Sequence, residues 1–277
     1  MLRAVIIRCL ILVVFILVAY GVMLFFAQDG MIYQAPPAYS AAELKRFRSD
    51  GLERIDFETS SGGQVAFYKG ASGGVSPDRI WLVFSGNGGR ACDYADVTQA
   101  GNWAYLFVDY PGYGLCEGSP SPKRIDAAVD GAIAALGEKL GLGEEQLSEK
   151  LCVLGHSLGA AVGLRAAVRH QIDTVVALAP FTTMKEMAAR TVGGLYSNVL
   201  RHRFDNVAAL RALEEGNPDA EVTIMSGSDD RMIPPSMGRR LAEQFPGIAE
   251  FRPLDGVGHN NIFDHRMEEV RSAMRGE

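Results

Sequence analysis

The 277-residue sequence has no long run of charge of one sign, and this absence narrows the partners that it can bind. Its 27 lysine and arginine residues are interleaved with 33 aspartate and glutamate residues, for a formal net charge of −6. A surface for nucleic acid is normally a basic stripe or patch. We therefore expect no nucleic-acid partner.

Cysteine is scarce as well, with four residues in the chain, too few for a disulfide-stapled scaffold. Cys9 lies in an apolar N-terminal run, and Cys152, in an expected strand, is most simply a buried thiol. Cys92 and Cys116 follow consecutive expected strands. A disulfide between these two is therefore a hypothesis that requires an oxidising compartment.

Motifs for phosphates and dinucleotides are missing too. The chain contains neither the G-x-x-x-x-G-K-[ST] phosphate loop nor the G-x-G-x-x-G fingerprint, and it has no internal repeat. No metal-ligand cluster or organic-cofactor motif is visible in the sequence. We expect neither a metal nor a cofactor.

One long apolar run is present, and it lies at the N-terminus. Cys9–Ala27 is 19 residues without a charge, and as a helix it would span roughly 28 Å, about the thickness of a hydrocarbon core. Arg3 and Arg8 precede it, and the next basic residue is Lys45. The excess of positive charge before the run predicts a single-pass anchor, residues 1–30, with a cytoplasmic N-terminus. The rest of the chain would then lie on the far side, in a periplasmic, lumenal or extracellular compartment.

A cleaved signal peptide is the competing interpretation of this run. Its apolar region would normally be shorter, and Phe25-Phe26-Ala27 is a poor match to a cleavage site of small residues. A buried helix of a soluble protein is the third alternative. The oligomeric state is open.

After a connector expected at residues 31–50, short apolar runs alternate with amphipathic ones. Strands are expected at 52–59 and 64–70 as a hairpin, and then at 79–86, 103–110, 150–155, 173–180, 221–227 and 249–256. Helices are expected at 121–141, 158–170, 236–245 and 260–275, with a further helix between the strands at 79–86 and 103–110 and an irregular helical stretch at 181–215. This alternation predicts an α/β fold with a mainly parallel, doubly wound sheet and antiparallel edge strands from the hairpin.

The stretch "GHSLG" places Ser157 between Gly155 and Gly159, after a buried strand and before a helix. A strand that turns directly into a helix leaves no room for side chains, so glycines are needed on both sides of the serine. The helix amides point toward the same position and favour negative charge there. The pattern predicts a nucleophile, with a serine in an ordinary glycine-rich turn as the alternative.

Two aspartates, Asp229 and Asp230, end a strand in "SGSDDRMIP". One of them can serve only to cap the next helix, and we favour Asp230 as the carboxylate that orients a histidine. His259 follows the last strand, so that Ser157, Asp230 and His259 occur in the order nucleophile, acid, base.

The other four histidines fit the role of base less well. His156 is expected to point the wrong way around the turn, His170 ends a helix, and His202 and His265 are expected in helical segments.

The glycine-rich stretch "SGNGG", residues 85–89, also follows a buried strand. Backbone of this kind can approach a bound acyl group closely. We expect the N–H groups of Asn87 and Leu158 to form an oxyanion hole, with a glycine-rich turn of no chemical role as the alternative.

From about Leu52 to its end, the chain resembles the α/β-hydrolase superfamily. More closely, it resembles the membrane-anchored serine hydrolases called bud-emergence-type (α/β-hydrolase domain-containing) proteins. The resemblance rests on the motifs "FSGNGG", "DYPGYGLCEGSPS", "GHSLGAAV", "SGSDDRMIPP" and "GVGHNNIF". Ser85 departs from it, because a histidine that braces the oxyanion loop is usual there, and Cys116 replaces a common serine.

The resemblance implies a serine hydrolase domain over residues 51–277 that cleaves an ester, thioester or amide of a small-molecule or acylated substrate. It places the acid of the triad at Asp230. The connection from Phe181 to Asn217 is short for a lid, which predicts a fairly open site. Two alternatives remain: a deacylase or thioesterase acting on lipidated protein, and a non-catalytic, membrane-tethered binding module of the same fold.

Overall fold

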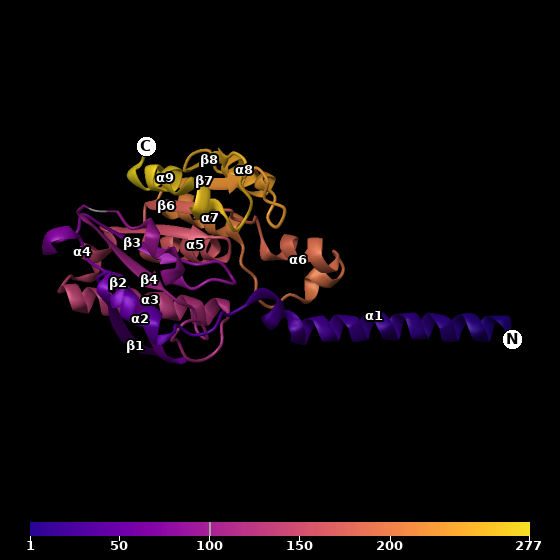
Figure 1. The fold of residues 1–277 in the computed structure, drawn as a ribbon. Helices are drawn as coiled ribbons and strands as arrows, with labels where there is room; N and C mark the ends of the chain where they lie inside the picture. The colour runs from indigo at the N-terminus through magenta and orange to yellow at the C-terminus, as the bar shows by residue number, and fades with distance from the viewer. Residues whose placement is uncertain (100) are drawn as a thin grey trace.

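The computed structural model describes residues 1–99 and 101–277. Eight strands form one sheet with helices on both faces, and a single long helix projects away from this body (Figure 1). The strand order is β1-β2-β4-β3-β5-β6-β7-β8. The strands β1 and β2 form an antiparallel hairpin at one edge, β2 pairs antiparallel with β4, and the remaining neighbours are parallel. The predicted sheet with its antiparallel edge is confirmed.

The strands are β1 (Leu52–Thr59), β2 (Gly62–Lys69), β3 (Arg79–Phe84), β4 (Trp103–Val108), β5 (Leu151–His156), β6 (Thr174–Leu178), β7 (Glu221–Gly227) and β8 (Ala249–Leu254). The α-helices are α1 (Leu2–Ile32), α2 (Ala41–Ser49), α3 (Pro122–Leu140), α4 (Glu144–Ser148), α5 (Leu158–His170), α6 (Met184–Val192), α7 (Asn206–Gly216), α8 (Pro235–Gln244) and α9 (Ile262–Arg275). Short 3₁₀ helices are η1 (Ser72–Gly74), η2 (Ala91–Val97) and η3 (Tyr196–Val199).

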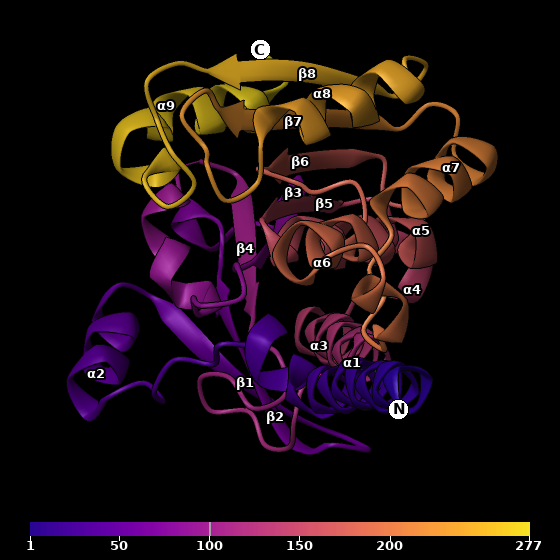
Figure 2. The same cartoon turned by 90° about the vertical axis from the view of Figure 1, so that its right-hand side faces the viewer.

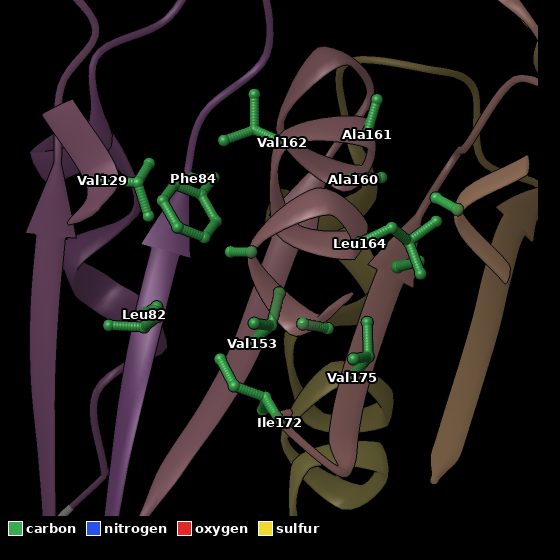
Figure 3. Close-up of a cluster of buried hydrophobic side chains, with 14 of the residues drawn as sticks. Leu82, Phe84, Val129, Val153, Ala160, Ala161, Val162, Leu164, Ile172 and Val175 are labelled. Atoms are coloured by element: carbon green, nitrogen blue, oxygen red, sulfur yellow. The ribbon is translucent and has the colours of Figure 1, made fainter. Parts of the chain in front are cut away.

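The core between α5 and the sheet sets the position of the turn that precedes this helix. Side chains of β3, β5 and α5 interlock there (Figure 3). At Gly163, a Cβ atom would lie 2.4 Å from the Val153 side chain, so only glycine lets the helix approach the strand so closely. This close packing holds the first residue of α5 over the carboxyl ends of β3 and β5.

Several elements differ from the sequence-based expectation. The helix expected between β3 and β4 is the 3₁₀ helix η2, and the 31–50 connector contains α2, which begins with a capping box of Ser40 and Glu43. The residue His202, expected in a helical segment, lies in irregular chain before α7. Tertiary contacts decide these cases, because such short elements carry little periodicity of their own.

All four cysteines are free thiols, and Cys92, Cys116 and Cys152 are buried. The hypothesis of a Cys92–Cys116 disulfide is therefore not supported. The Cys116 thiol instead exchanges hydrogen bonds with the backbone of Val65, at 3.3 and 3.4 Å. The two cysteines follow consecutive strands, but they serve different contacts in the core.

In the part of the chain that the structure describes, α1 is the one helix long and apolar enough to cross a membrane. Most of its side chains are exposed, and its contacts with the body lie in its second half, from Leu17 onward. Viewed along its axis, α1 lies next to the segment that follows α6, which contains η3 (Figure 2).

Candidate active site

The turn from β5 to α5 holds Ser157 in a backbone conformation that non-glycine residues rarely adopt, with φ 56° and ψ −114°. A Cβ atom on Gly155 would lie 2.2 Å from the carbonyl oxygen of Gly159, and one on Gly159 would lie 2.2 Å from the carbonyl oxygen of Phe84. The packing of helix on strand therefore requires both glycines, as the sequence predicted. Strain of this kind is found where a side chain is presented for function.

On the neighbouring loops, Asp230 and His259 form a buried pair. The Nδ1 atom of His259 lies 2.7 Å from Oδ2 of Asp230, whose side chain has no exposed surface. The other carboxylate oxygen accepts hydrogen bonds from the N–H groups of Met232 and Ile233, at 2.9 and 2.8 Å. Three donors therefore fix this carboxylate in one orientation.

The loops that carry this pair are held together at Gly227, the last residue of β7. A Cβ atom there would lie 2.2 Å from the carbonyl oxygen of Val257, so glycine allows the chain before His259 to pass directly over the strand end. The N–H of Asp229 then donates to Val257 at 3.0 Å, while its side chain stays exposed. Of the two aspartates, Asp229 thus belongs to the turn and Asp230 contacts the histidine.

The stretch after β3 lies over the same strand ends. Asn87 and Leu158 line one cavity together with Ser157. Among the hydrogen bonds of the described residues, the N–H of Asn87 has no acceptor, and Leu158 is the first residue of its helix, where an N–H has no intrahelical partner. In the described part of the chain, neither of the two expected oxyanion donors is therefore engaged by a backbone acceptor.

Two tyrosines that the sequence reasoning did not single out hold this stretch in place. Tyr110 donates its hydroxyl hydrogen to the carbonyl of Ser85 at 2.6 Å, and Tyr113 donates to the carbonyl of Asn87 at 2.7 Å. The Ser85 hydroxyl itself donates to the carbonyl of Gly89 at 2.8 Å. Both tyrosines belong to the motif "DYPGYG", and their spacing of three residues is the signal for this role in the sequence.

A third unexpected contributor is His156, which the sequence reasoning set aside as pointing the wrong way. Its ring lies 4.8 Å from that of His259, and its Nε2 is 2.9 Å from the His259 carbonyl oxygen. A carbonyl only accepts, so Nε2 carries the hydrogen and Nδ1 accepts from the Tyr94 hydroxyl at 3.1 Å. Burial, reinforced by nearby His259, lowers the pKa of His156 to about 3. This neutral ring holds the backbone of His259.

The remaining histidines lie elsewhere and do not contact the triad residues. His170 pairs with Asp130 at 2.8 Å, His202 lies 2.5 Å from Asp29, and His265 belongs to α9. They are not part of the site. Within residues 1–99 and 101–277, no three His, Cys, Asp or Glu side chains gather in a way that could hold a metal ion.

Between Ser157 and His259 the structure contains no hydrogen bond among the described residues, and neither the serine hydroxyl nor Nε2 of His259 has another partner there. Both groups are nevertheless nearly buried, with 6% and 7% of their surface exposed. In ligand-free sites such contacts are often long and tighten with substrate.

Ser157 lines an apolar cavity of about 230 Å³. Its walls come from α6, the segment around η3, and the last turns of α1, which include Leu24 and Ile32. The expected open site therefore stays a prediction, because the cavity keeps an exposed lining residue in Met232. The Phe181 to Asn217 connection supplies only part of the wall, and the last turns of α1 supply another part.

Comparison with known proteins places the chain in context. The sequence profile described as "Alpha/beta hydrolase family" matches residues 71–216, just over half of the chain. An uncharacterized protein of Mycobacterium tuberculosis is 28% identical over 255 residues, which cover 88% of this chain and 85% of that protein. Alpha/beta hydrolase domain-containing protein 17C of Homo sapiens is 27% identical over 189 residues, covering 66% of this chain and 54% of that protein.

Solved structures show the same fold. An esterase of Pyrococcus furiosus superposes with a TM-score of 0.63 at 14% identity, covering 87% of this chain and 95% of that chain. Est1E of Butyrivibrio proteoclasticus has a TM-score of 0.61 at 15% identity, with 82% and 98% of the two chains covered. At these identities, the likeness concerns the arrangement of the chain.

Proposed function

The chain belongs to the alpha/beta hydrolase family, and we propose that it is a membrane-anchored serine hydrolase that cleaves an ester, thioester or amide through Ser157, Asp230 and His259. The observation that carries this proposal is the buried Asp230–His259 pair at 2.7 Å, on loops beside a strained serine turn. The names of the relatives and the esterase activity in the names of the structural neighbours agree with it.

In the proposed reaction, His259 removes the proton from Ser157 as the serine oxygen attacks the carbonyl carbon of the substrate. Asp230, fixed by its three hydrogen bonds, keeps the Nδ1 hydrogen on His259 and stabilises the imidazolium that forms. The histidine then donates the proton to the leaving group. Water, activated by the same histidine, releases the acyl group from Ser157.

The negative charge of the tetrahedral intermediate would be held by the N–H groups of Asn87 and Leu158. Each such donor is worth about 3 kcal/mol in related oxyanion holes, because it is oriented before the charge develops. The tyrosine hydroxyls bound to the carbonyls of Ser85 and Asn87 provide that orientation here. No step of this mechanism uses a metal or an organic cofactor.

We further propose that residues 1–30 form an uncleaved single-pass anchor, followed by a connector to residue 50 and the hydrolase domain at residues 51–277. The charge pattern favours a cytoplasmic N-terminus and a domain on the far side. Contacts of α1 with the domain support an anchor that is retained, because cleavage after the apolar run would remove part of the cavity wall.

Labelling with a fluorophosphonate probe tests the proposed chemistry. The wild-type protein should become labelled, and Ser157→Ala should not, because the probe reacts only with an activated serine. Hydrolysis of 4-nitrophenyl acetate should follow the same pattern. A wild-type protein that neither labels nor hydrolyses the ester would instead be a non-catalytic binding module, the rival function for this fold.

The apolar cavity next to Ser157 favours acyl substrates over peptides. Within the proposal, a thioesterase or deacylase that acts on lipidated protein is therefore the second candidate. Comparing matched oxygen esters and thioesters of the same acyl chain separates the two, since a deacylase of this kind should prefer the thioester.

A further inference from the structure

We infer that the anchor helix α1 is a wall of the acyl-binding cavity and that the acyl chain of a bilayer-embedded ester or thioester reaches Ser157 sideways, from within the membrane. This inference rests on the proposed hydrolase function and on the proposed anchor. It goes beyond them by assigning α1 a part in substrate binding and by naming the phase from which the substrate comes.

The first support is the make-up of the cavity. Leu24, Met31 and Ile32 of α1 line it on one side, and Met184 and Met187 of α6 line it on the other. Ser157, the proposed nucleophile, lines the same cavity. An acyl chain attached to the carbonyl that Ser157 attacks would therefore extend between α6 and α1, with apolar side chains on both sides.

A second support is the way in which α1 is fixed to the domain. The Asp29 carboxylate lies 2.7 Å from the Arg201 guanidinium and 2.5 Å from Nε2 of His202. The side chain of Gln28, only 6% exposed, accepts a hydrogen bond from the backbone N–H of Arg201 at 2.6 Å. These contacts hold the end of the helix in one orientation, as a wall requires and a flexible tether does not.

The same helix end also contacts the oxyanion stretch. The side-chain amide of Asn87 donates to the carbonyl of Ile32 at 3.0 Å, and the N–H of Gln34 donates to the carbonyl of Asn87, also at 3.0 Å. The anchor and the expected oxyanion donor are therefore parts of one hydrogen-bonded unit.

The third support is the level at which the cavity lies relative to the bilayer. Tyr196 of η3 donates its hydroxyl hydrogen to the carbonyl of Leu17 at 3.2 Å, and its ring meets that of Tyr20 edge-on at 4.8 Å. Leu17 is ten residues before Ala27, the end of the uncharged run, so η3 reaches back about 15 Å along it. A run that spans the hydrocarbon core thus brings η3 to the level of the lipid acyl chains.

Exposed apolar side chains near η3 agree with this placement. Leu195, which immediately precedes η3, is 68% exposed, and Met232, which lines the cavity, is 53% exposed. Together with the exposed side chains of α1, they add apolar surface near the cavity. Large exposed apolar surfaces of this kind mark membrane contact. In Figure 1, the α6 end of the domain lies on the side from which α1 projects.

A pair of variants on neighbouring residues of α1 tests the wall. Leu24 is 6% exposed and lines the cavity, whereas Met23 is 53% exposed and faces away from it. The assay uses full-length protein reconstituted in phosphatidylcholine vesicles. Leu24→Trp should lower kcat/KM for 4-nitrophenyl decanoate at least about tenfold, because the loss of each buried methylene group of the acyl chain lowers kcat/KM about fourfold. Leu24→Trp should lower hydrolysis of 4-nitrophenyl acetate by a much smaller factor than hydrolysis of the decanoate, and Met23→Trp should leave the hydrolysis of both substrates unchanged.

Met187→Trp on the opposite wall gives a second, independent variant, with Arg190→Trp on the exposed side of α6 as its control. Fluorophosphonate labelling of every variant reports whether its site is assembled. Suppose that wild-type protein hydrolyses the acetate but that Leu24→Trp and Met23→Trp cleave the decanoate equally well. Then α1 is not a wall of the acyl-binding cavity, whereas the proposed hydrolase function stands. If wild-type protein hydrolyses neither ester and does not label, the proposed function itself has failed.

Entry from the bilayer is tested by surface dilution. With 4-methylumbelliferyl oleate at constant bulk concentration, added phosphatidylcholine lowers its mole fraction in the vesicles. The rate of the reconstituted enzyme should fall in proportion to the mole fraction. A rate that follows only the bulk concentration would mean that the acyl chain enters from water and would overturn the sideways route.

Discussion

Asp229 and Asp230 are adjacent in the chain, yet their side chains lie in very different surroundings. The carboxylate of Asp230 is fully buried with three hydrogen-bond donors, whereas Asp229 is exposed and its nearest side-chain donor is Ser228 at 3.3 Å. A charge that is buried and fully hydrogen-bonded can orient a neighbouring group, and an exposed one is solvated by water.

The Asp230→Asn variant should therefore lower kcat by about 10³- to 10⁴-fold, because an amide lets His259 take the wrong tautomer and cannot stabilise the imidazolium. The matched control Asp229→Asn should stay within about twofold of wild type. Steady-state hydrolysis of 4-nitrophenyl acetate measures both. Equal losses in the two variants would contradict the assignment of the acid.

His156 gives a prediction on pH. Its pKa is lowered from 6.5 to about 3 in the folded protein by burial, so below pH 6.5 the unfolded chain binds a proton there that the folded protein does not. The folded state therefore loses stability as pH falls through this window, by about 2 kcal/mol between pH 6.5 and pH 5. Well above pH 6.5 the His156 ring is neutral in both the folded and the unfolded state, so it adds no further pH dependence to the free energy of unfolding.

Thermal unfolding of wild type and of His156→Asn, each at pH 7 and pH 5, isolates this effect. The wild type should lose stability relative to the variant at pH 5. Asp109, whose pKa burial raises to about 6, acts in the opposite direction but is present in both proteins and cancels in the comparison. If the difference in unfolding temperature between wild type and His156→Asn is the same at pH 7 and pH 5, His156 is not held neutral by burial.

At the scale of elements, the contact between α5 and β3 positions the nucleophile. It depends on residues without side chains, because the backbone of Gly159 packs directly on the carbonyl of Phe84. The helix, the strand and the serine turn therefore form a single rigid unit. A change in the spacing of the two elements would move Ser157 away from the Asn87 stretch.

Gly159→Ala should destabilise the protein by about 3 kcal/mol, since a Cβ atom would lie 2.2 Å from a backbone oxygen that cannot move aside. The control is Gly216→Ala in α7, where a Cβ atom would meet nothing within 4 Å. That change should be neutral or raise the stability by up to about 1 kcal/mol through helix propensity. Unfolding temperatures measure both, and a Gly159→Ala protein as stable as wild type would contradict the close packing.

For the whole molecule, the proposed topology makes a simple prediction. In a bacterial host, alkaline phosphatase fused after Glu277 should be active, because it folds only outside the cytoplasm, and green fluorescent protein at the same place should not fluoresce. The opposite pair of results would place the domain in the cytoplasm. Replacing Arg3 and Arg8 with glutamate should weaken the preference for a cytoplasmic N-terminus, since these two charges set the predicted orientation of the anchor.

Local patterns in the sequence determined the fold class and the chemistry to look for. Buried strands and amphipathic helices have their own periodicities, and the glycines around Ser157 report a steric need within a few residues. The order of Ser157, Asp230 and His259 could therefore be predicted, and so could the free N–H of Leu158, because the first turn of any helix leaves its amides unpaired.

Only the tertiary structure decided which distant segments meet. It showed that Asp230, the aspartate already favoured from the sequence, contacts His259, and it placed the ring of His156 on the backbone of His259. Most of all, it brought the second half of α1 against η3 and the oxyanion stretch, so that α1 lines the same cavity as Ser157. Contacts between residues so far apart depend on how the elements pack as three-dimensional bodies, and neither periodicity nor motif spacing encodes that packing.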